Sequence, residues 1–569
     1  RNSHPPGKPC QAGPIGSLAL MSDLLERVLG QLRAILCDKR LAEVVASLVV
    51  SSASLLAGFA LLTWNEKRSL PPGPWPYPLL GNFPHLLPGG PHRALQGLHK
   101  KYGPLLTVWY GSKLTIVLGS PELVQQTHRE QQEKFQHRTL TEFAKLSLKA
   151  DEEGGKNVAL AGGRYWVKAR KVFVQELMNK RFVERECVPK IMEEIWSTMD
   201  AMHGLGGSAF DPHEHLQRLS CNIVYRLTYG IRFKRSDIGN KDSEWGQLHD
   251  IINSIMQLGG QNVRANFVPL LKMMERLTSQ GRALNRRRRE LVAKRDRLLE
   301  RLLAEHKQTL KPECPRDFLD VLLLRKDKDG LTEEEVMYIA WEFITAGTDT
   351  TSATMHWLTL LSANHVEHQK RAQREIDEVC KGRPVSLEDQ DKLPYVNAYI
   401  KECMRWMPVV PLMVPYRATD DAKVRLGERT YTIRKGTQVI VNGFNMHRDP
   451  ELWEDPDAFN PERFMTGPDA DIELKGADGP NDTHHLKFMP LGTGRRACAG
   501  ALLAKIELFL QGATLLQCFN WRPASGETVP LKEVFGIAVA AGHAEVTAEW
   551  RTASGLDIGK VTATFGSHA

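Results

Sequence analysis

The sequence lacks the features by which several classes of protein are recognised. Its nine cysteines are scattered over 569 residues without a Cys-x-x-Cys pair. This spacing argues against a disulfide framework and a zinc site, and it is typical of a reducing compartment. No Gly-x-Gly-x-x-Gly pattern is present, so the chain has no dinucleotide-binding motif of its own. The net charge of +8 is small for this length and does not require a nucleic-acid partner.

The start of the chain lacks a methionine. The sequence opens with Arg1, residues 1–20 are rich in proline, glycine and serine, and the first methionine is Met21. We therefore expect residues 1–20 to be an upstream or non-native segment. We expect residues 21–43 to be a polar N-terminal segment.

One long run lacks charge altogether. Residues 44–64 are 21 consecutive uncharged residues that end at Trp64. A helix of this length spans the roughly 30 Å hydrocarbon core of a bilayer, and tryptophan is typical of its interface. A signal peptide or a buried helix would also be apolar, but the run is too long for the former and no cleavage site follows it. We expect a transmembrane anchor, whose orientation is not set by charge because basic residues flank both ends.

A proline-rich segment follows the uncharged run. Residues 70–78 read Leu-Pro-Pro-Gly-Pro-Trp-Pro-Tyr-Pro, and this density of proline favours a stiff, extended linker over a helix. We expect a hinge over residues 65–82 and a globular domain over residues 83–553. Residues 554–569 are rich in glycine, serine and threonine, and we expect a flexible tail there.

Hydrophobic periodicity in the globular part is mostly helical. Apolar residues three and four apart predict long helices at 183–204, 214–229, 280–308, 333–363, 367–380, 394–406 and 500–517. Short strand-like runs lie at 105–110, 114–118, 423–426, 431–433 and 438–441. The pattern predicts a mainly α fold with a small β-rich part.

The stretch around Cys498 carries the strongest chemical signal. Residues 488–500 read Phe-Met-Pro-Leu-Gly-Thr-Gly-Arg-Arg-Ala-Cys-Ala-Gly, and an apolar, helix-prone run follows. Glycines let the backbone approach a flat ligand closely, and free N–H groups at a helix start favour a thiolate. Such a thiolate is a natural axial ligand for haem iron. The alternative is a buried cysteine in a turn.

A second signal lies midway along the helix predicted over residues 333–363. Thr332 and Glu335 predict a capping box at its start. Residues 346–351 read Ala-Gly-Thr-Asp-Thr-Thr, which is poor helix material. Threonine hydroxyls can bond to the carbonyl four residues earlier and loosen the helix. A loosened polar turn could hold water, oxygen and protons; the alternative is a buried helix that tolerates small residues.

Two further sets of residues have helical spacing. Glu402 and Arg405, three positions apart, can form a bidentate ion pair, and Arg463 follows in a Pro-Glu-Arg-Phe stretch. Trp166 and Arg170, four positions apart, can both point at one anionic group.

These motifs, in this order, resemble the cytochrome P450 family over about residues 65–553. The resemblance implies a mostly helical cytochrome P450 fold with a small β-rich subdomain, preceded by one N-terminal transmembrane helix. It also implies haem b bound through the thiolate of Cys498. One position departs from the pattern, because Leu491 stands where the family usually has an aromatic residue.

The resemblance implies roles for individual residues. Asp349 and Thr350 would deliver protons during oxygen activation, and Glu402, Arg405 and Arg463 would fix the segment that carries the cysteine loop. The haem would be held by Trp166, Arg170, Tyr416, Arg496, Cys498 and Gly500. The substrate pocket would be lined by Phe343, Ile344, Ala346, Val410, Met413, Ile537 and Val539.

The implied activity is that of a haem-thiolate monooxygenase, which inserts one oxygen atom from O2 into an apolar organic substrate. Electrons would come from NADPH through a separate cytochrome P450 reductase, with cytochrome b5 as an optional further donor. The protein would be a single-pass protein of the endoplasmic reticulum membrane with a cytosolic catalytic domain. Two alternatives are a reductase-independent isomerase or dehydratase of hydroperoxides, whose members typically lack the acid–threonine pair, and a non-catalytic haem-binding protein.

Overall fold

The computed structural model describes residues 64–566, apart from 88, 152, 153, 234–241, 261, 262, 475–482 and 537, together with isolated positions between 43 and 58. Most of the predicted anchor at residues 44–64 therefore lies outside the described residues. The chain divides into two compact units, residues 1–69 and residues 70–569.

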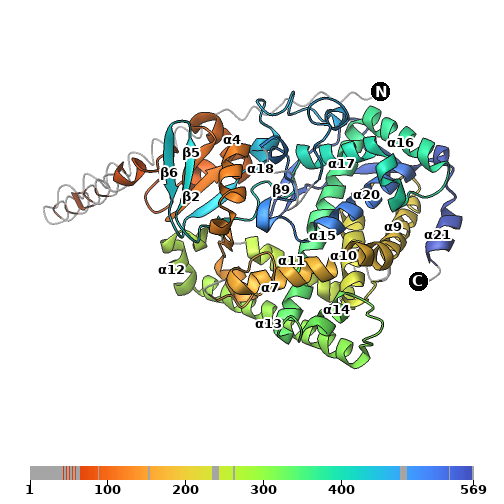
Figure 1. Cartoon of the computed structure of the whole chain (residues 1–569), viewed down its shortest axis with the longest axis horizontal. Coiled ribbons are helices and arrows are strands. Elements are labelled where there is room, and N and C mark those ends of the chain that lie inside the picture. Colours follow the sequence, from red (N-terminus) through yellow and green to blue (C-terminus); the bar gives the residue numbers. More distant parts are fainter. Residues whose placement is uncertain are drawn as a thin grey trace, which may run out of the picture. The chain divides into compact units, whose positions relative to one another are not determined.

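Helix α15 (Glu333–Asn364) forms the centre of the helical part (Figure 1). Its start carries the predicted capping box: Glu335 N donates to Thr332 Oγ1 at 3.2 Å, and Thr332 N donates to Glu335 Oε2 at 2.8 Å. Most of its residues are buried because other helices pack around it. These are α10 (His213–Tyr229), α13 (Ser279–Thr309), α14 (Phe318–Arg325), α16 (Val366–Cys380), α17 (Pro394–Trp406) and α20 (Ala501–Cys518).

The other helices of eight or more residues in the described part of the chain lie further from this centre. They are α4 (Pro91–Tyr102), α7 (Gly163–Val172), α9 (Val188–His203), α11 (Glu244–Gly260), α12 (Pro269–Leu277) and α21 (Ile558–Gly566).

The main sheet has five strands in the order β1-β2-β7-β4-β3. Its members are β1 (Leu105–Tyr110), β2 (Lys113–Leu118), β3 (His137–Arg138), β4 (Tyr416–Arg417) and β7 (Gln438–Val441). β1 and β2 form an antiparallel hairpin, β7 runs parallel to β2, and β3 and β4 close the far edge. The register pairs Arg138 with Tyr416, so the sheet brings two residues that are distant in sequence side by side.

Three two-stranded sheets complete the β-structure of the described residues. They pair β5 (Ala422–Leu426) with β6 (Arg429–Ile433), β8 (Phe519–Pro523) with β11 (Val546–Trp550), and β9 (Glu533–Phe535) with β10 (Val539–Ala541). The mainly α fold with a small β-rich part is as the sequence predicts.

The proline-rich segment is docked on the sheet from residue 70 onward, which corrects the prediction of a free hinge reaching residue 82. Thr107 N donates to the carbonyl of Pro72 at 2.8 Å. Asn82 is fully buried; its Oδ1 accepts from Trp109 N at 2.8 Å and its Nδ2 donates to the carbonyl of Trp75 at 3.0 Å. Extended proline backbone cannot complete its own hydrogen bonds, and here the neighbouring strand β1 takes part of them.

The predicted flexible tail over residues 554–569 is also corrected. Residues Ile558–Gly566 form helix α21, whose Val561 is buried and whose Phe565 ring stacks on Trp196 of α9 with centroids 6.1 Å apart. Glycine and threonine are weak helix formers, so packing of this apolar face on α9 outweighs the unfavourable composition.

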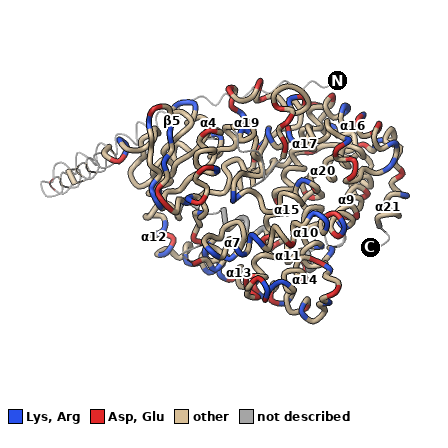
Figure 2. The backbone as a smooth tube through the Cα atoms, in the orientation of Figure 1, with Lys and Arg blue, Asp and Glu red and all other residues tan. Residues whose placement is uncertain are grey.

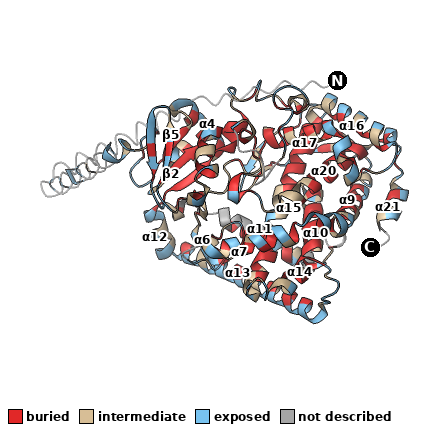
Figure 3. Cartoon of the chain, viewed as in Figure 1, coloured by how far each residue is buried: buried red, intermediate tan, exposed pale blue. Residues whose placement is uncertain are grey.

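Burial and charge follow the layering of the helices. Figure 3 shows buried residues concentrated on α15, α17 and α20, and Figure 2 shows charged residues along outer helices such as α13. One described helix, α20, is long and apolar enough to cross a membrane, but 78% of that window is buried inside the protein, as expected for a core helix.

Candidate functional site

The cysteine loop holds its thiol beside the start of a helix. A short 3-10 turn (Gly494–Arg496) precedes Cys498, and α20 begins at Ala501. Cys498 N donates to the carbonyl of Leu491 at 2.8 Å, which closes the loop. Burial raises the pKa of the Cys498 thiol, while the N–H of Gly500, which hydrogen-bonds the sulfur, opposes that shift. The side chain is nevertheless solvent-exposed, so it lies deep in the protein with one side accessible.

Gly494 fixes the shape of this loop. Its φ is +65°, and a Cβ there would lie 2.3 Å from the carbonyl oxygen of His128. Left-handed backbone and close approach both require glycine at this position. The resulting turn directs Arg496 inward, where it is buried.

Three arginines, Arg138, Arg170 and Arg496, gather beside the loop. The neighbouring carboxylate of Glu342 cannot neutralise all three. Arg496 donates to the backbone carbonyls of Gln136 and Ala161 and, at 3.2 Å, to that of Val158. Burial lowers the pKa of Arg496 to about 8, and the positive charges of Arg138 and Arg170 add to that shift.

Trp166 and Arg170 on α7 belong to the same cluster. The Arg496 guanidinium lies 4.1 Å from the Trp166 ring centroid, and that of Arg170 lies 5.8 Å from it. Trp166 is buried, and its indole N–H has no hydrogen-bond partner among the described residues. A buried donor without a partner costs about 1–3 kcal/mol, so this donor indicates a missing acceptor.

Arg138 is a site residue that sequence reasoning missed. Strand pairing places it over Tyr416, with the guanidinium 4.0 Å from the ring centroid. Its Nη1 donates to the carbonyl of Val414 at 2.5 Å, and its Nε has no partner within the described structure. No local signal identifies it, because it lies on a two-residue strand whose partner is 278 positions away in the register.

These groups fit a haem. A soft thiolate suits the iron, and the cluster of three buried arginines with the unpaired indole N–H of Trp166 suits the anionic propionates. Burial and the charges of Arg138 and Arg170 lower the pKa of Arg496, and Glu342 offsets this only in part. Tyr416, buried beside Arg138, offers a hydroxyl but no charge.

One face of α15 turns toward this cluster. Glu342, Ala346 and Thr350 are four positions apart, so they share a helix face. Glu342 interacts electrostatically with Arg496 and Arg170, and its carboxylate accepts hydrogen bonds from the backbone of Val158 and Ala159. Burial raises the pKa of Glu342 to about 7. Ala346 is exposed although the preceding turn of the helix is buried.

The Thr-rich turn retains its helical form. Thr350 Oγ1 donates to the carbonyl of Ala346 at 2.7 Å, and Thr348 Oγ1 donates to that of Ile344 at 2.7 Å, as the spacing predicts. The helix nevertheless runs without a break from residue 333 to residue 364. The predicted loosening of the helix is therefore wrong at the level of secondary structure: the hydroxyl bonds add to the helix without interrupting it.

Asp349 lies on the side of α15 that meets α10. Its carboxylate hydrogen-bonds Gln217, and burial raises its pKa. The two helices approach closely, because a Cβ on Gly347 would lie 2.6 Å from Val224 Cγ1. Asp349 and Thr350 thus flank one stretch of backbone, with the acid toward α10 and the hydroxyl on the accessible face.

The predicted pocket residues separate into two groups. Ala346 is exposed, and Val410 and Met413 are half-buried. Phe343 stacks on Phe173 with centroids 4.3 Å apart, and its ring is buried in the core. Its place on the pocket wall stays a prediction.

Ile344 and Val539 are likewise fully buried, and their place in the pocket also stays a prediction. Val539 is held through its backbone, since its N–H donates to the carbonyl of Val409 at 2.7 Å and its carbonyl accepts from Trp357 Nε1 at 3.1 Å. Ile537 lies outside the described residues.

Glu402, Arg405 and Arg463 meet in one group, in which Glu402 and Arg405 are fully buried and Arg463 is half-buried. Arg405 donates to both oxygens of Glu402, at 2.7 and 2.8 Å, and Arg463 Nε lies 3.1 Å from Glu402 Oε2. Arg405 also donates to the carbonyls of His447 and Pro456, at 2.7 and 2.8 Å. The group ties α17 to the segment that leads to the cysteine loop.

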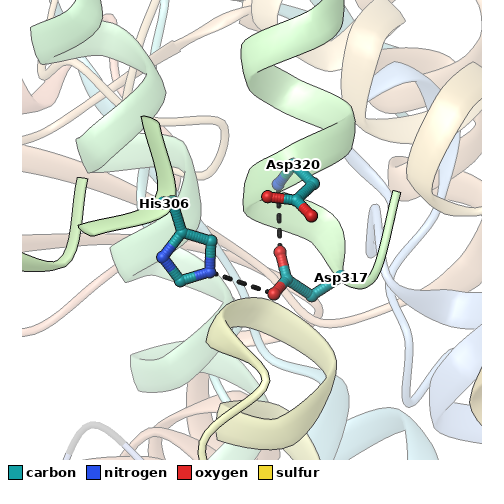
Figure 4. A group of neighbouring side chains, drawn as sticks. All are labelled: His306, Asp317 and Asp320. Carbon is teal, nitrogen blue, oxygen red and sulfur yellow. Dashed lines mark hydrogen bonds and ion pairs between the residues drawn. The ribbon is translucent and has the colours of Figure 1, made fainter. Parts of the chain in front are cut away.

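A second cluster of potential metal ligands lies elsewhere, and it is explained by helix capping. Figure 4 shows His306, Asp317 and Asp320 together. Asp317 caps α14 by accepting from Asp320 N at 3.0 Å, and its other oxygen lies 3.0 Å from His306 Nε2. Burial opposes a charge on His306, but the hydrogen bond to Asp317 outweighs it and raises the pKa. Arg316 Nε donates to Asp320 Oδ2 at 2.8 Å, so the charge of Asp320 is neutralised.

Comparisons with known proteins agree with this geometry. Residues 71–547 match the family model for cytochrome P450. The chain is 31% identical to cytochrome P450 98A2 of Glycine max over 84% of its length and 90% of that protein. It is 31% identical to the iridoid oxidase of Catharanthus roseus over 86% of its length and 95% of that protein. A zebra fish cytochrome P450 solved with abiraterone superposes with a TM-score of 0.66 at 29% identity, covering 81% of this chain and 99% of that one.

Proposed function

The chain belongs to the cytochrome P450 family and is a monooxygenase of that family, and we propose that it inserts one oxygen atom from O2 into an apolar organic substrate, with the thiolate of Cys498 as ligand of a haem iron. The observation that carries this proposal is the position of Cys498. Its accessible thiol accepts the N–H of Gly500 and lies within electrostatic reach of Arg170 and Glu342.

The arginine cluster would hold the haem by its propionates. Arg496, Arg138 and Arg170 supply charge, the indole N–H of Trp166 supplies a donor, and Tyr416 supplies a hydroxyl. Charge-assisted bonds to carboxylates are stronger than neutral ones, so an anion at this place would relieve the repulsion among the three guanidinium groups. Bound haem supplies the iron at which O2 takes up electrons.

Asp349 and Thr350 would handle protons on the other side of the haem site. Burial raises the pKa of Asp349 above that of a free aspartate and so brings it closer to neutral pH. This suits a group that gives up and regains a proton. The Thr350 hydroxyl lies on the face of α15 that includes exposed Ala346, so of the two groups it is the one that a ligand at this face would meet.

The substrate would be a small apolar molecule. The predicted pocket residues that remain accessible, Ala346, Val410 and Met413, carry no charge. Burial of apolar surface at roughly 25 cal/mol per Å² would then drive binding, and selectivity among similar substrates would be modest.

Electrons would come from NADPH through a separate cytochrome P450 reductase, with cytochrome b5 as an optional further donor. Lys171 and Arg495 are exposed on the side of the cysteine loop and suit an acidic partner. Lys168 is less suited, because its Nζ is bound to Glu335 at 3.1 Å and to the carbonyl of Gly330 at 2.7 Å. A location in the endoplasmic reticulum membrane, with the catalytic domain in the cytosol, is part of this proposal.

The reductase-independent alternative, rearrangement or dehydration of hydroperoxides, receives less support. That chemistry needs no proton supply during oxygen activation, whereas this chain places Asp349 and Thr350 together on α15.

The test is the replacement Cys498→Ser. A serine hydroxyl does not provide the soft thiolate, so the reduced, carbon-monoxide-bound protein should lose the red-shifted Soret band of thiolate-ligated haem. The matched control is Cys314→Ser, which changes an exposed free cysteine elsewhere in the chain and should leave the band intact. Survival of the band in Cys498→Ser would show that another residue is the ligand and would refute the proposal.

A further inference from the structure

Helices α10 and α15 pack against each other (Figure 1), and a column of polar side chains, each buried or half-buried, lies between them. Asp349 and His356 are two turns apart on α15, and His213 and Gln217 are one turn apart on α10. These spacings place each pair on one face of its helix. Two buried helices in a mostly apolar core usually meet through apolar side chains, so this column requires an explanation.

The inner end of the column is Asp349. Its carboxylate hydrogen-bonds Gln217 and interacts electrostatically with His213 and His249. The Gln217 side-chain oxygen lies 3.4 Å from His249 Nε2. Asp349 precedes Thr350, whose hydroxyl lies on the accessible face of α15, so the inner end of the column adjoins the haem site.

The outer end of the column reaches solvent. His356 Nε2 lies 3.5 Å from Asp211 Oδ1, and Asp211 Oδ2 is 2.5 Å from His543 Nδ1. The His543 side chain is 75% exposed. Burial favours a neutral Asp211, but the hydrogen bond from His543 outweighs it and lowers the Asp211 pKa. Asp211 is therefore a carboxylate joined to a solvent-exposed imidazole.

The two middle histidines have unused hydrogen-bonding atoms. His356 is fully buried, and its ring centroid lies 5.4 Å from that of His213. Within the described structure, three ring nitrogens lack a hydrogen-bond partner: Nδ1 and Nε2 of His356, and Nδ1 of His213. Buried polar atoms of this kind are normally satisfied by ordered water, which would complete the links between the rings.

The protonation states suit transfer through neutral groups. Burial lowers the pKa of His356 to about 4, with Asp211 opposing and His213 and His543 adding to the shift. His356 is therefore neutral near pH 7. A neutral imidazole can accept a proton on one nitrogen and release one from the other.

We propose that this column is a proton-supply route from solvent at His543 through Asp211, His356 and His213 to Asp349. The inference rests on the proposed function. Each turnover combines O2, two electrons from NADPH, two protons and the substrate R–H to give R–OH and one water. The column would deliver those protons, and each group would be reprotonated from its outer neighbour, so that it returns to its starting state.

The decisive variant is His356→Leu, which keeps a buried side chain of similar size but interrupts the route. Product per NADPH should fall about tenfold, less than the ~10²–10⁴ that loss of a direct proton donor costs, because water provides a slower path. The solvent deuterium isotope effect on NADPH-driven turnover should rise. Turnover driven by hydrogen peroxide should be unchanged, since H2O2 and R–H give R–OH and water without added protons or electrons.

Two further variants separate proton supply from packing. Asp211→Asn acts at the outer end, leaves His356 in place, and should also lower product per NADPH and raise the isotope effect. His99→Gln is the matched control: His99 is also buried, and burial lowers its pKa to about 4, but it lies on α4, outside the column. It should leave the isotope effect unchanged even if it lowers stability.

A titration followed by NMR of 13C-labelled histidine gives a readout that needs no turnover. The hydrogen bond to Asp211 raises the pKa of His543, and this raised value should fall in Asp211→Asn. Equal losses of NADPH-driven and peroxide-driven turnover in His356→Leu, or an unchanged isotope effect in both variants, would overturn the route. Failure of the proposed function would be seen separately, as a wild-type protein without the thiolate spectrum or without NADPH-driven product.

Discussion

At the scale of single residues, the proposed haem site is defined by three arginine charges, which the neighbouring carboxylate of Glu342 does not balance on its own. Arg138, Arg170 and Arg496 are largely removed from water, and the pKa of each is lowered, with burial as the largest cause. Removing a charge from water is costly unless a counter-charge is close. Binding of a dianionic ligand at this cluster would therefore contribute to stability as well as to function.

Thr350→Ala tests the role of the hydroxyl on α15. The Thr350 hydroxyl donates to the carbonyl of Ala346 at 2.7 Å, and the backbone of the helix does not depend on this bond. Removing the hydroxyl should therefore leave the fold and the thiolate spectrum intact. Product per NADPH should fall, by up to ~10²–10⁴ if the hydroxyl donates a proton in the transition state. Coupling is measured as product formed against NADPH consumed. Thr354→Ala is the control, because the Thr354 hydroxyl makes the same kind of bond, to the carbonyl of Thr350 at 2.8 Å. Equal losses of product per NADPH in both variants would show that Thr350 contributes only to helix packing.

Glu507→Gln tests a buried carboxyl in the core. Burial raises the pKa of Glu507 on α20 from 4.5 to about 8, and Gln511 Nε2 lies 3.5 Å from it. The folded state thus holds a proton that the unfolded state releases between pH 4.5 and 8, so stability present at low pH is lost as pH rises through this range. Relative to wild type, the glutamine variant should gain stability between pH 5 and pH 8, by a few kcal/mol at most.

Urea unfolding at pH 5, 6.5 and 8 measures this gain. Glu527→Gln, an exposed position in the same C-terminal region, should give a difference from wild type that does not vary with pH. Parallel stability curves for wild type and Glu507→Gln would show that the folded protein ionises Glu507 normally.

At the scale of elements, the contact between α10 and α15 depends on a missing side chain. A Cβ on Gly347 would lie 2.6 Å from Val224 Cγ1, and a β-branched valine has little freedom to move. Gly347→Ala should therefore destabilise the protein by about 1–3 kcal/mol through overpacking, although alanine is the better helix former by about 1 kcal/mol.

A double-mutant cycle with Val224→Ala decides between these two effects. In that background the clash is gone, so Gly347→Ala should become stabilising by up to about 1 kcal/mol. Unfolding free energies of the four proteins measure the sign. The same destabilisation in both backgrounds would mean that Gly347 is required for a reason other than its contact with Val224.

Most of the long helices were predictable from local signals, although the sequence analysis did not predict α11. Helix α15 has a capping box and predicted bounds of 333–363 against the observed Glu333–Asn364, and α17 begins at Pro394 as expected. Strands β3 and β4 were not predictable, since two residues form no periodic pattern and pairing comes from the fold. Helix α21 was missed because its stability depends on packing against α9.

The residues of the candidate site fall into the same two classes: those that local motifs predict and those that only the fold brings together. Cys498, Arg496 and Trp166 lie in motifs whose residues are close in sequence, so the motif implies the site. Arg138 has no such motif and enters the site only through its pairing with Tyr416. Helical spacing alone does not show which face of α15 turns to the core, whereas the stack of Phe343 on Phe173 does.

At the scale of the whole molecule, exposed apolar side chains gather on one region of the catalytic unit. Helix α12 exposes Leu270, Met273 and Leu277. The loop before it is fixed to the β1–β2 hairpin, since Ser112 N donates to the carbonyl of Phe267 at 2.9 Å, and the Phe267 ring lies 6.4 Å from that of Phe83. The exposed residues Trp75, Tyr77, Leu79, Leu80 and Leu87 lie in the segments around Phe83. Patches of this kind mark surfaces that contact membranes or other proteins.

Deletion of residues 21–64 tests how the protein holds to a membrane. The deletion removes the uncharged run but none of the haem-site residues, so the thiolate spectrum should be retained and tight membrane association should be lost. Because α12 remains, we expect weak residual binding to phospholipid vesicles, measured by co-sedimentation.

Adding Leu277→Glu to the truncated protein should abolish this remaining vesicle binding, since a charge on the apolar face of an interfacial helix opposes insertion. Leu324→Glu, at an exposed apolar position on α14, is the control and should leave it unchanged. Equal binding by all three truncated proteins would exclude α12 as a membrane contact.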